Sequence, residues 1–600
     1  MAKRLHRVLP LLVCVLALPV CALFVRPQVE LGIIDDWSYI RSAEILAATA
    51  HVVYNGWATA MLGWQLYLGA LLIKLFGFSF TVVRAGTLLT AMATAALMQR
   101  LFVRLGVGEW NAAAGTLTFV LSPVFLCTAF SYMSDVSGMV VLAGCCYCCV
   151  RALEAATDRA ALAWIGAAAL SNALGGTARQ IAWLGVLVMV PSTLWLLRRK
   201  RSVLRLGGAF ALAGMVAAMW FLYWFDHQPW AIAEPLVPAT RVSPGFLVGH
   251  VAVRFVRGCG FELIFLALPV LLMFVPVVLR NRRTVLAAVV WVAFCALYLA
   301  HLHRVHKMFT WEVPYLYNSL WFWGFDYFHA YLGEPPVLLT LPVRLVLTAL
   351  VLLAVLSFFT AVLIDRRDEP AEAGGGRTVI SGRDLCILLL PCTVAYMLLL
   401  VPRWIALDTI LDRYLLFPEF VFLVFALRLY QQKLHRRLPP AVWVTIAAAA
   451  VLDTAGMHDA FALFRAQSAL LNRVVASGVA RTEIDGGIQF NGWTELASTG
   501  HMNDPRVVRP AGMYIPRRVI QANDPCRTER LELTPSVRAR YVVSFDPAAC
   551  GGLSPFAPET FHTWFGPHTR TLYVVKGPYS EANRPPAGGA GVLPAPDLVK

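Results

Sequence analysis

Two adjacent carboxylic acids, Asp35 and Asp36, follow an apolar run, 8–25, that is long enough to cross a membrane. Carboxylates at such a place could accept a proton from a hydroxyl group or hold a cation. A cationic leader, 1–7, precedes the run. Because positive residues beside a span favour the cytoplasm, we expect both acids to face the opposite side of the membrane. Any chemistry that they perform is then extracytoplasmic.

A second acid and several cations are predicted at the same membrane face. Asp135 lies at the outer end of the third predicted span, where it could join the site or simply cap the helix that follows. Arginine suits bidentate contact with phosphate. The alternative for each cation is contact with lipid headgroups. The cations in question are Arg84, Arg179, Arg304, Lys307, Arg403 and Arg413, of which Arg413, beside Tyr414, is the strongest candidate.

Two histidines near these cations are weak candidates for a metal site. His303 and His306 have the i, i+3 spacing that places two side chains on one helix face. The sequence has neither a cysteine nor an acidic cluster close to them, as a complete metal site would need. An interfacial or phosphate-proximal role is the alternative.

The composition is that of a polytopic membrane protein. Hydrophobic residues make up 58% of the 600 positions, charged residues make up 14%, and the mean hydropathy is +0.65. Soluble proteins carry about 25% charged residues. The formal net charge of +16 could suggest nucleic acid as a partner. Its clusters flank apolar runs, however, which is a topology signal, so we expect a membrane and no nucleic acid.

Windows of about 20 apolar residues predict thirteen transmembrane helices. With the N-terminus in the cytoplasm, this number places the basic clusters on one side and the C-terminus outside. The segment 64–80 is also apolar, but counting it would move 198–201 and every later basic cluster outside. We therefore interpret it as an amphipathic or re-entrant element on the outer face. The predicted spans are 8–25, 81–100, 110–130, 136–153, 160–176, 180–197, 204–225, 259–280, 284–301, 341–364, 384–402, 413–430 and 440–456.

The predicted fold is an all-α polytopic membrane domain, 1–456, with about 13 transmembrane helices, followed by a small extracytoplasmic domain, 457–583. The outer loop 26–80 carries the acidic pair. Turn signals and alternating runs after 457 predict an α/β or β-rich fold for the second domain. Residues 584–600, rich in Pro, Gly and Ala, are predicted to be disordered.

Cys526 and Cys550 both belong to the second predicted domain. An oxidising compartment would allow them to form a disulfide. Two unpaired thiols are the alternative, and the sequence does not choose between them.

Several of these motifs resemble the GT-C membrane glycosyltransferases, the group that includes protein O-mannosyltransferases and the aminoarabinose transferase of lipid A. The stretch from Asp35 to Glu44 resembles the first outer loop of that group, with a second Asp where the group typically has Glu. Tyr132-Met133-Ser134-Asp135 occupies the place of the group's second acid, and Asp412-Arg413-Tyr414 resembles its late Arg-Tyr motif. The likeness covers roughly 8–456 in order and topology.

The resemblance implies an inverting transfer of a sugar from a polyprenyl-phosphate donor to a hydroxyl acceptor on a lipid, glycan or protein. It implies that Asp35 is the general base, and that Asp36 or Asp135 orients the acceptor or holds a divalent metal ion, as in some members. Arg413, Tyr414, Arg179, Arg84 and Lys307 would bind the donor's phosphate or lipid. The location implied is the inner membrane of a cell envelope. We expect Asp35 and Arg413 to share one water-accessible vestibule.

Two other functions stay open at the level of sequence. A transporter or lipid flippase would also have polar groups at helix ends, and it predicts charged residues at mid-span and discontinuous helices in paired halves. A non-catalytic scaffold could have kept the same fold. The sequence has no Walker A loop and no GxGxxG in a βαβ context, which argues against an ATP-driven pump or an enzyme with a soluble nucleotide-sugar domain.

Overall fold

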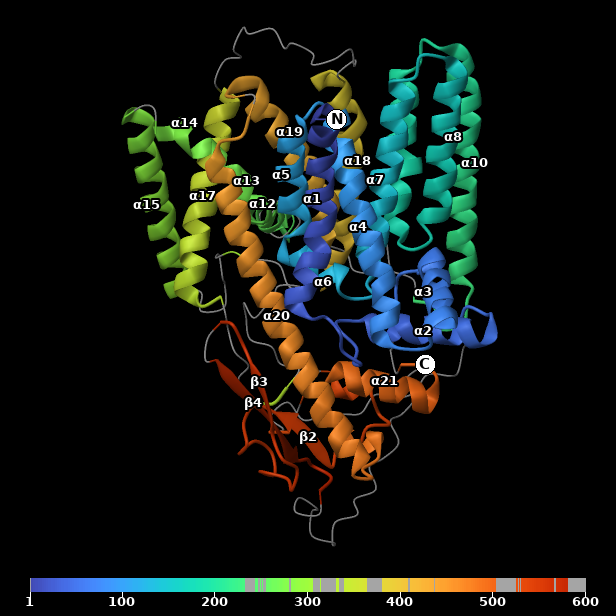
Figure 1. The fold of residues 1–600 in the computed structure, drawn as a ribbon, viewed down its shortest axis with the longest axis vertical. Helices are drawn as coiled ribbons and strands as arrows, with labels where there is room; N and C mark the ends of the chain where they lie inside the picture. The colour runs from blue at the N-terminus through green and yellow to red at the C-terminus, as the bar shows by residue number, and fades with distance from the viewer. Residues whose placement is uncertain are drawn as a thin grey trace.

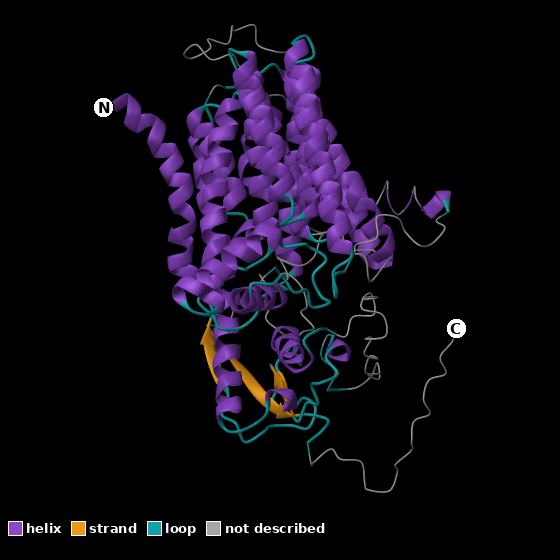
Figure 2. Ribbon diagram, turned by 90° about the vertical axis from the view of Figure 1, so that its right-hand side faces the viewer, coloured by secondary structure: helices purple, strands orange, loops and turns teal. Residues whose placement is uncertain are grey.

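The structure is a bundle of long helices with a small sheet domain at one end (Figures 1 and 2). It is a computed structural model. The residues that it describes are 2–232, 243–246, 249, 251, 255–279, 282–305, 313, 331–333, 339–363, 380–407, 410–435, 437–502, 525–526, 528, 530–565 and 568–580.

Helices of the bundle occupy every segment that the sequence predicts as a span. Their bounds are α1 (Ala2–Val25), α4 (Phe80–Arg104), α5 (Glu109–Val120), α6 (Pro123–Ala129), α7 (Ser134–Leu153), α8 (Asp158–Gly175), η1 (Gln180–Trp183), η2 (Gly185–Met189), α9 (Val190–Leu196), α10 (Arg201–Asp226), α12 (Val256–Leu266), α13 (Leu268–Leu271), η4 (Leu272–Phe274), α14 (Val275–Leu279), α15 (Arg282–Val305), α17 (Leu341–Leu363), α18 (Gly382–Leu407), η5 (Asp412–Leu415), α19 (Leu416–Lys433) and α20 (Pro440–Ala476). A short helix, α11 (Pro244–Phe246), lies between α10 and α12 in the sequence.

Eight of these helices are long and apolar enough to cross a membrane, or up to ten if each bent pair is one span, among the described residues. The bent pairs are α5 with α6, at 69°, and α12 with α13 and α14, at 72°. Pro123 explains the first bend, because the residue before a proline avoids the helical conformation and proline itself suits the first turn of a new helix. The total of thirteen spans stays a prediction.

The first outer loop folds into two helices, α2 (Asp36–Thr49) and α3 (Gly63–Phe76). With 14 residues, α3 is about 21 Å long, too short to cross a hydrocarbon layer of about 30 Å. One side of α3 is buried and another exposes Tyr67, Leu71 and Leu75. This agrees with the interpretation of 64–80 as an element that does not span the bilayer.

Helix α20 joins the bundle to the sheet domain. It was expected to end at 456, but it continues as one helix to Ala476, so it crosses the predicted domain boundary (Figure 1). Burial explains the extension: Phe461, Phe464 and Leu471 on its second half are part of the main core.

The C-terminal domain is a four-stranded sheet with helix α21 (Ile488–Thr499) beside it. The strand order is β1-β2-β4-β3, with β1 parallel to β2 and the other pairs antiparallel. The bounds are β1 (Ile484–Asp485), β2 (Tyr541–Ser544), β3 (Glu559–His562) and β4 (Thr569–Lys576), with short η6 (Arg481–Glu483) and η7 (Leu531–Leu533). The expected small α/β domain is therefore present, and Cys526 and Cys550 form a disulfide in it.

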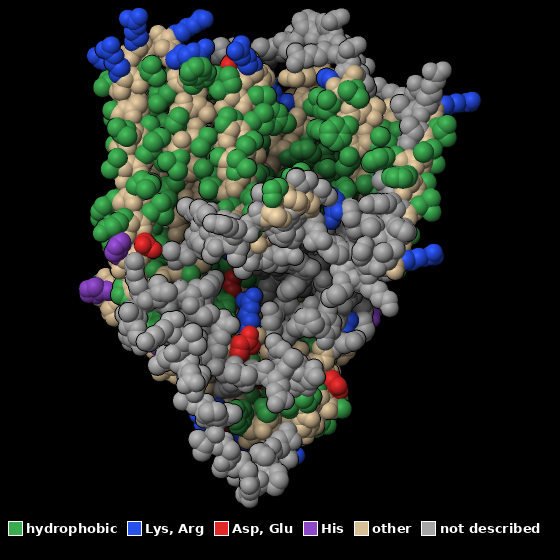
Figure 3. All heavy atoms as spheres, turned by 180° about the vertical axis from the view of Figure 1, so that it is seen from behind, with side chains coloured by type: hydrophobic (Ala, Val, Ile, Leu, Met, Phe, Trp, Pro, Cys, Tyr) green, Lys and Arg blue, Asp and Glu red, His purple; other side chains and the backbone are tan. Residues whose placement is uncertain are grey.

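Basic side chains gather at the end of the bundle that lies away from the sheet domain (Figure 3). Arg198 and Lys200, for example, belong to the turn between α9 and α10, and Arg201 is the first residue of α10. This distribution is the one that the basic clusters predicted.

Candidate functional site

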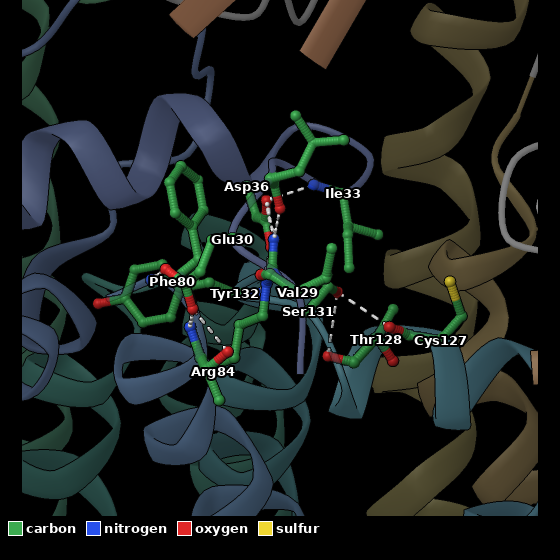
Figure 4. Close-up of polar contacts among 12 residues, drawn as sticks. Val29, Glu30, Ile33, Asp36, Phe80, Arg84, Cys127, Thr128, Ser131 and Tyr132 are labelled. Atoms are coloured by element: carbon green, nitrogen blue, oxygen red, sulfur yellow. Dashed lines mark hydrogen bonds and ion pairs between the residues drawn. The ribbon is translucent and has the colours of Figure 1, made fainter. Parts of the chain in front are cut away.

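Asp36 is buried at the start of α2, where its carboxylate accepts four hydrogen bonds from three residues (Figure 4). Its carboxylate accepts hydrogen bonds from the backbone N–H groups of Ile33, at 2.7 Å, and Tyr132, at 3.1 Å. Arg84 donates to it from Nε at 2.7 Å and from Nη2 at 3.2 Å. We call this arrangement the Asp36 clamp.

The clamp also uses the remaining donors of Arg84. Its Nη1 and Nη2 donate to the carbonyl oxygens of Val29, at 2.8 Å, and Leu31, at 2.5 Å. A buried ion pair is stable only when further hydrogen bonds satisfy both groups, and here they do. The clamp therefore fixes the loop before α2 against α4 and against the chain between α6 and α7.

Asp35, the neighbouring acid, points to a different set of partners. Its Oδ1 accepts the indole N–H of Trp57 at 3.0 Å, and Nη2 of Arg413 lies 3.4 Å from its Oδ2. The side chain of Asp35 remains 23% exposed, so water reaches it. The expectation that Asp35 and Arg413 share one vestibule agrees with this contact.

The residue before Asp35 holds a strained backbone. Ile34 has φ +54°, a conformation that β-branched residues rarely adopt. Such strain persists only where the surrounding structure imposes it, and it is concentrated at functional sites. Ile34 is the residue directly before the two acids.

Asp135, in the first turn of α7, lies between two arginines. Its Oδ1 is 2.9 Å from Nη1 of Arg179, and its Oδ2 is 3.5 Å from Nε of Arg413. The side chain is 1% exposed. It makes no capping hydrogen bond, and the N-cap residue of α7 is Met133, so the ion-pair partners of this acid among the described residues are the two arginines.

Arg413 thus connects two aspartates, and three arginines surround the neighbouring Tyr414. The guanidinium carbons of Arg179, Arg403 and Arg413 lie 4.9, 5.4 and 5.9 Å from the Tyr414 ring centre. Cations near an aromatic face are attracted by its negative charge density. Tyr414 therefore helps to hold like charges together in one place.

A small pocket opens beside these charges. Among the described residues, its lining combines one acid, two arginines and a tyrosine with an apolar wall from α7 and α19. The residues are Asp135, Gly138, Met139, Leu142, Arg179, Ile181, Tyr396, Arg413, Leu416 and Phe417. The pocket therefore has a polar end and an apolar wall.

Sequence reasoning missed two tyrosines at this site. Tyr396 lines the pocket, and Tyr39 on α2 interacts electrostatically with Asp35 and Arg413. Burial raises the pKa of Tyr39, so its hydroxyl keeps its proton. Tyr39 could have been found by its spacing, because the residue four after Asp35 lies one helical turn away. No signal in the sequence singles out Tyr396 among the apolar residues of α18.

One predicted site residue lies away from the pocket, and three others cannot be placed. Arg84, expected at the donor phosphate, is in the Asp36 clamp and does not line the pocket. Lys307 and His306 fall outside the described residues, and so does the side chain of His303 on α15.

The acids at this site do not fit a divalent cation. Asp35 and Asp135 are both paired with arginines, and a cation between them would be repelled by Arg179 and Arg413. The described residues contain no group of three or more His, Cys, Asp or Glu side chains that could hold a metal ion. We assign no step to a metal.

No protein-family model matches this chain, and no curated protein matches it. Solved structures similar to it include ArnT from Cupriavidus metallidurans in the apo state, at 14% identity over 82% of this chain and 84% of that one, with a TM-score of 0.36. The same ArnT bound to undecaprenyl phosphate has 14% identity over 93% and 96%, with a TM-score of 0.35.

An Archaeoglobus fulgidus oligosaccharyltransferase, in complex with Zn and sulfate, has 15% identity over 74% of this chain and 53% of that one, with a TM-score of 0.35. These neighbours belong to the GT-C superfamily, which the sequence motifs also resemble.

Proposed function

We propose that this chain is an integral-membrane inverting glycosyltransferase that moves a sugar from a polyprenyl-phosphate donor to a hydroxyl acceptor on the extracytoplasmic side. The observation that carries the proposal is the contact between Asp35 and Arg413 beside the pocket. It joins an exposed carboxylate, which can act as a base, to a buried cation, which can hold a phosphate.

The reaction is a single displacement at the anomeric carbon. The acceptor oxygen attacks that carbon, and its proton passes to a carboxylate oxygen of Asp35. The bond between the anomeric carbon and the phosphate oxygen breaks, and its electron pair leaves with the polyprenyl phosphate. Attack from the side opposite the leaving group inverts the configuration.

Arg413 and Arg179 would stabilise the charge that develops on the leaving phosphate. Arg413 is 5% exposed, and among the described residues its Nε and Nη1 have no acceptor in hydrogen-bond geometry. Burial of such donors is costly unless a ligand supplies the acceptor. Phosphate oxygens beside Asp135 and Tyr396 would do so, and the lipid would follow the apolar wall of the pocket.

Asp36 and Arg84 act as positioning residues in this proposal. All their strong contacts are to each other or to the backbone, so neither has an oxygen or nitrogen directed to the pocket. Their role is to hold α2, and with it Asp35, in place. The second acid that assists the reaction is then Asp135, through Arg413 and Arg179.

The proposal places the site on the outer face of an inner membrane, with the N-terminus in the cytoplasm. The gathering of basic side chains at the far end of the bundle supports this orientation (Figure 3). The disulfide supports it too, because such bonds persist in oxidising compartments.

The test is sugar transfer by the purified chain in proteoliposomes. The probes are undecaprenyl phosphate carrying radiolabelled mannose, glucose or aminoarabinose, with envelope membranes from cells that lack this chain as the acceptor. Wild-type protein should release undecaprenyl phosphate and label the membranes, and Asp35→Asn should abolish both. Asp158→Asn, at an exposed acid of the opposite end, is the matched control and should keep full activity. Transfer by the Asp35→Asn variant would refute the proposal for the base.

A flippase is the rival that one feature favours, because the two bent helix pairs resemble discontinuous spans. The same proteoliposomes separate the two functions. Movement of the intact lipid-linked sugar across the bilayer, without release of undecaprenyl phosphate, would mark a flippase.

A further inference from the structure

The C-terminal domain lies directly on the loop that carries Asp35. Gly492 on α21 packs against Trp37 so closely that an added Cβ would lie 2.6 Å from the ring. Trp493 lies 5.5 Å from the guanidinium of Arg41, and the backbone N–H of Met502 donates to the carbonyl of Asn55 at 2.8 Å. The domain and the outer loop therefore form one continuous contact.

One arginine of this domain reaches the partner of Asp35. The guanidinium carbon of Arg530 lies 5.7 Å from the ring centre of Trp57. The indole N–H of Trp57 donates to Asp35 at 3.0 Å, and its ring centre lies 5.2 Å from that of Trp37. Trp57 thus contacts both Trp37 and Arg530 while it binds the carboxylate.

The segment that carries Arg530 is pinned at several points. Cys526, four residues earlier, forms the disulfide with Cys550. Thr528 donates to the buried carboxylate of Asp485 at 2.5 Å, and this carboxylate also accepts Asn491 at 2.6 Å. Arg530 itself has φ +62°, a left-handed conformation that a non-glycine residue keeps only under constraint.

We propose that Arg530 is a positioning residue for Asp35, acting through Trp57, and that the disulfide-pinned segment of the C-terminal domain therefore completes the base site. This inference rests on the proposed transferase function. The cation attracts the face of Trp57 and limits rotation of the indole, so the N–H stays directed at Asp35. A base whose carboxylate stays aligned with the acceptor hydroxyl reacts faster than one that samples several orientations.

The test compares Arg530→Ala, Arg530→Lys and Trp57→Phe in the transfer assay. Arg530→Ala should lower kcat by roughly ten- to a hundredfold, the range expected for misplacement by about 1 Å, and should leave the KM for the donor unchanged. Arg530→Lys should recover part of the loss, because it keeps a cation over the ring. Trp57→Phe removes the indole N–H, and adding Arg530→Ala to it should cost little more, because both act on one hydrogen bond.

Arg540→Ala is the matched control. Arg540 also lies over an aromatic ring of the same domain, 5.5 Å from Tyr541, but it has no contact with the outer loop among the described residues. It should keep the wild-type kcat. Normal activity of Arg530→Ala, a raised donor KM, or losses that multiply in the double variant would overturn the proposal.

Hydrogen exchange separates this proposal from the transferase proposal. Arg530→Ala should increase amide exchange in residues 51–62 around Trp57, and Arg540→Ala should not. If the wild-type chain transfers no sugar, the transferase proposal fails, and exchange alone then decides whether Arg530 holds this loop. Unchanged amide exchange in residues 51–62 of Arg530→Ala would refute the positioning role, whatever the transfer activity of that variant.

Discussion

The guanidinium of Arg413 lies 3.4 Å from the carboxylate of Asp35, although 378 positions separate the two residues. Arg413 also faces the buried Asp135 at 3.5 Å. One cation therefore links an acid from the first outer loop to an acid in the first turn of α7. The predictions below follow from this link and from the clamp beside it.

Replacement of Arg413 should cost both stability and donor binding. Arg413→Gln leaves Asp135 buried with one partner fewer, and loss of one member of a buried ion pair costs about 3–5 kcal/mol. The KM for the lipid-linked sugar should rise and kcat should fall. Arg413→Lys should not restore either value, because lysine cannot direct separate nitrogens to two acids. Thermal unfolding and transfer kinetics check these outcomes.

The double variant Arg413→Gln/Asp135→Asn tests whether Arg413 acts only by pairing with Asp135. It also removes the carboxylate that lies 2.9 Å from Arg179, so the protein should unfold at a lower temperature than Arg413→Gln alone. Transfer should remain lost. Recovery of transfer in the double variant would show that Arg413 only neutralises Asp135.

The Asp36 clamp should affect turnover without affecting donor binding. Arg84→Gln removes four donor contacts from the buried loop, and we expect a loss of about 3 kcal/mol or more in the free energy of unfolding. Because Asp35 moves with α2, kcat should fall while the donor KM stays constant. A raised donor KM with normal stability would instead mean that Arg84 contacts the phosphate.

Glycine usually makes a protein less stable than alanine does at the same position. The strained backbone at Ile34 predicts the opposite order of stability there. Both Ile34→Ala and Ile34→Gly lose a buried side chain, and only glycine adopts φ +54° without strain. The glycine variant should therefore be more stable than the alanine variant, by about 1 kcal/mol. Thermal unfolding of the two purified proteins decides this, and equal or inverted stabilities would contradict the strain.

Glu30 should make the stability of the outer loop depend on pH. Burial alone would raise the pKa of Glu30, but hydrogen bonds from Ser79, Thr81 and the backbone N–H of Phe80 outweigh it and lower the pKa below the ordinary 4.5. A lowered pKa in the folded state stabilises the protein above the unfolded pKa, and the stabilisation is lost as the pH falls through the folded pKa.

The measurement is the melting temperature of the wild-type protein and Glu30→Gln between about pH 6 and pH 3.5, a range that brackets the carboxyl pKa. The wild-type advantage should be present at pH 6 and shrink in acid. An advantage that stays constant or grows as the pH falls would contradict the lowered pKa.

The positions of the helices were predictable because they depend on local apolar length. Every predicted span contains a helix, and the exclusion of 64–80 agrees with the short helix α3. The end of α20 was not predictable, because its last 20 residues mix polar and apolar side chains and pack against the C-terminal domain. Hydropathy predicts where a helix is buried in lipid, but it does not predict where a helix packs against a second domain.

The candidate site was predictable only in part. Asp35, Asp135, Arg179, Arg413 and Tyr414 meet as the motifs suggested, since short polar motifs at helix ends stand out in an apolar chain. The different roles of Asp35 and Asp36 were not visible, because adjacent residues of the same type look alike in a sequence. Their backbone turns the two carboxylates to different partners, one in the clamp and one in the vestibule.

The sequence by itself determined that this is a membrane protein and that its composition changes near 457, and it predicted one membrane face for the acids and cations. These properties depend on residue type and order along the chain. Only the tertiary structure decided which acid is buried, that Arg84 serves the clamp, that Tyr396 lines the pocket, and that Arg530 reaches Trp57. Such contacts join residues far apart in the chain, and packing, which no local pattern encodes, sets their distances.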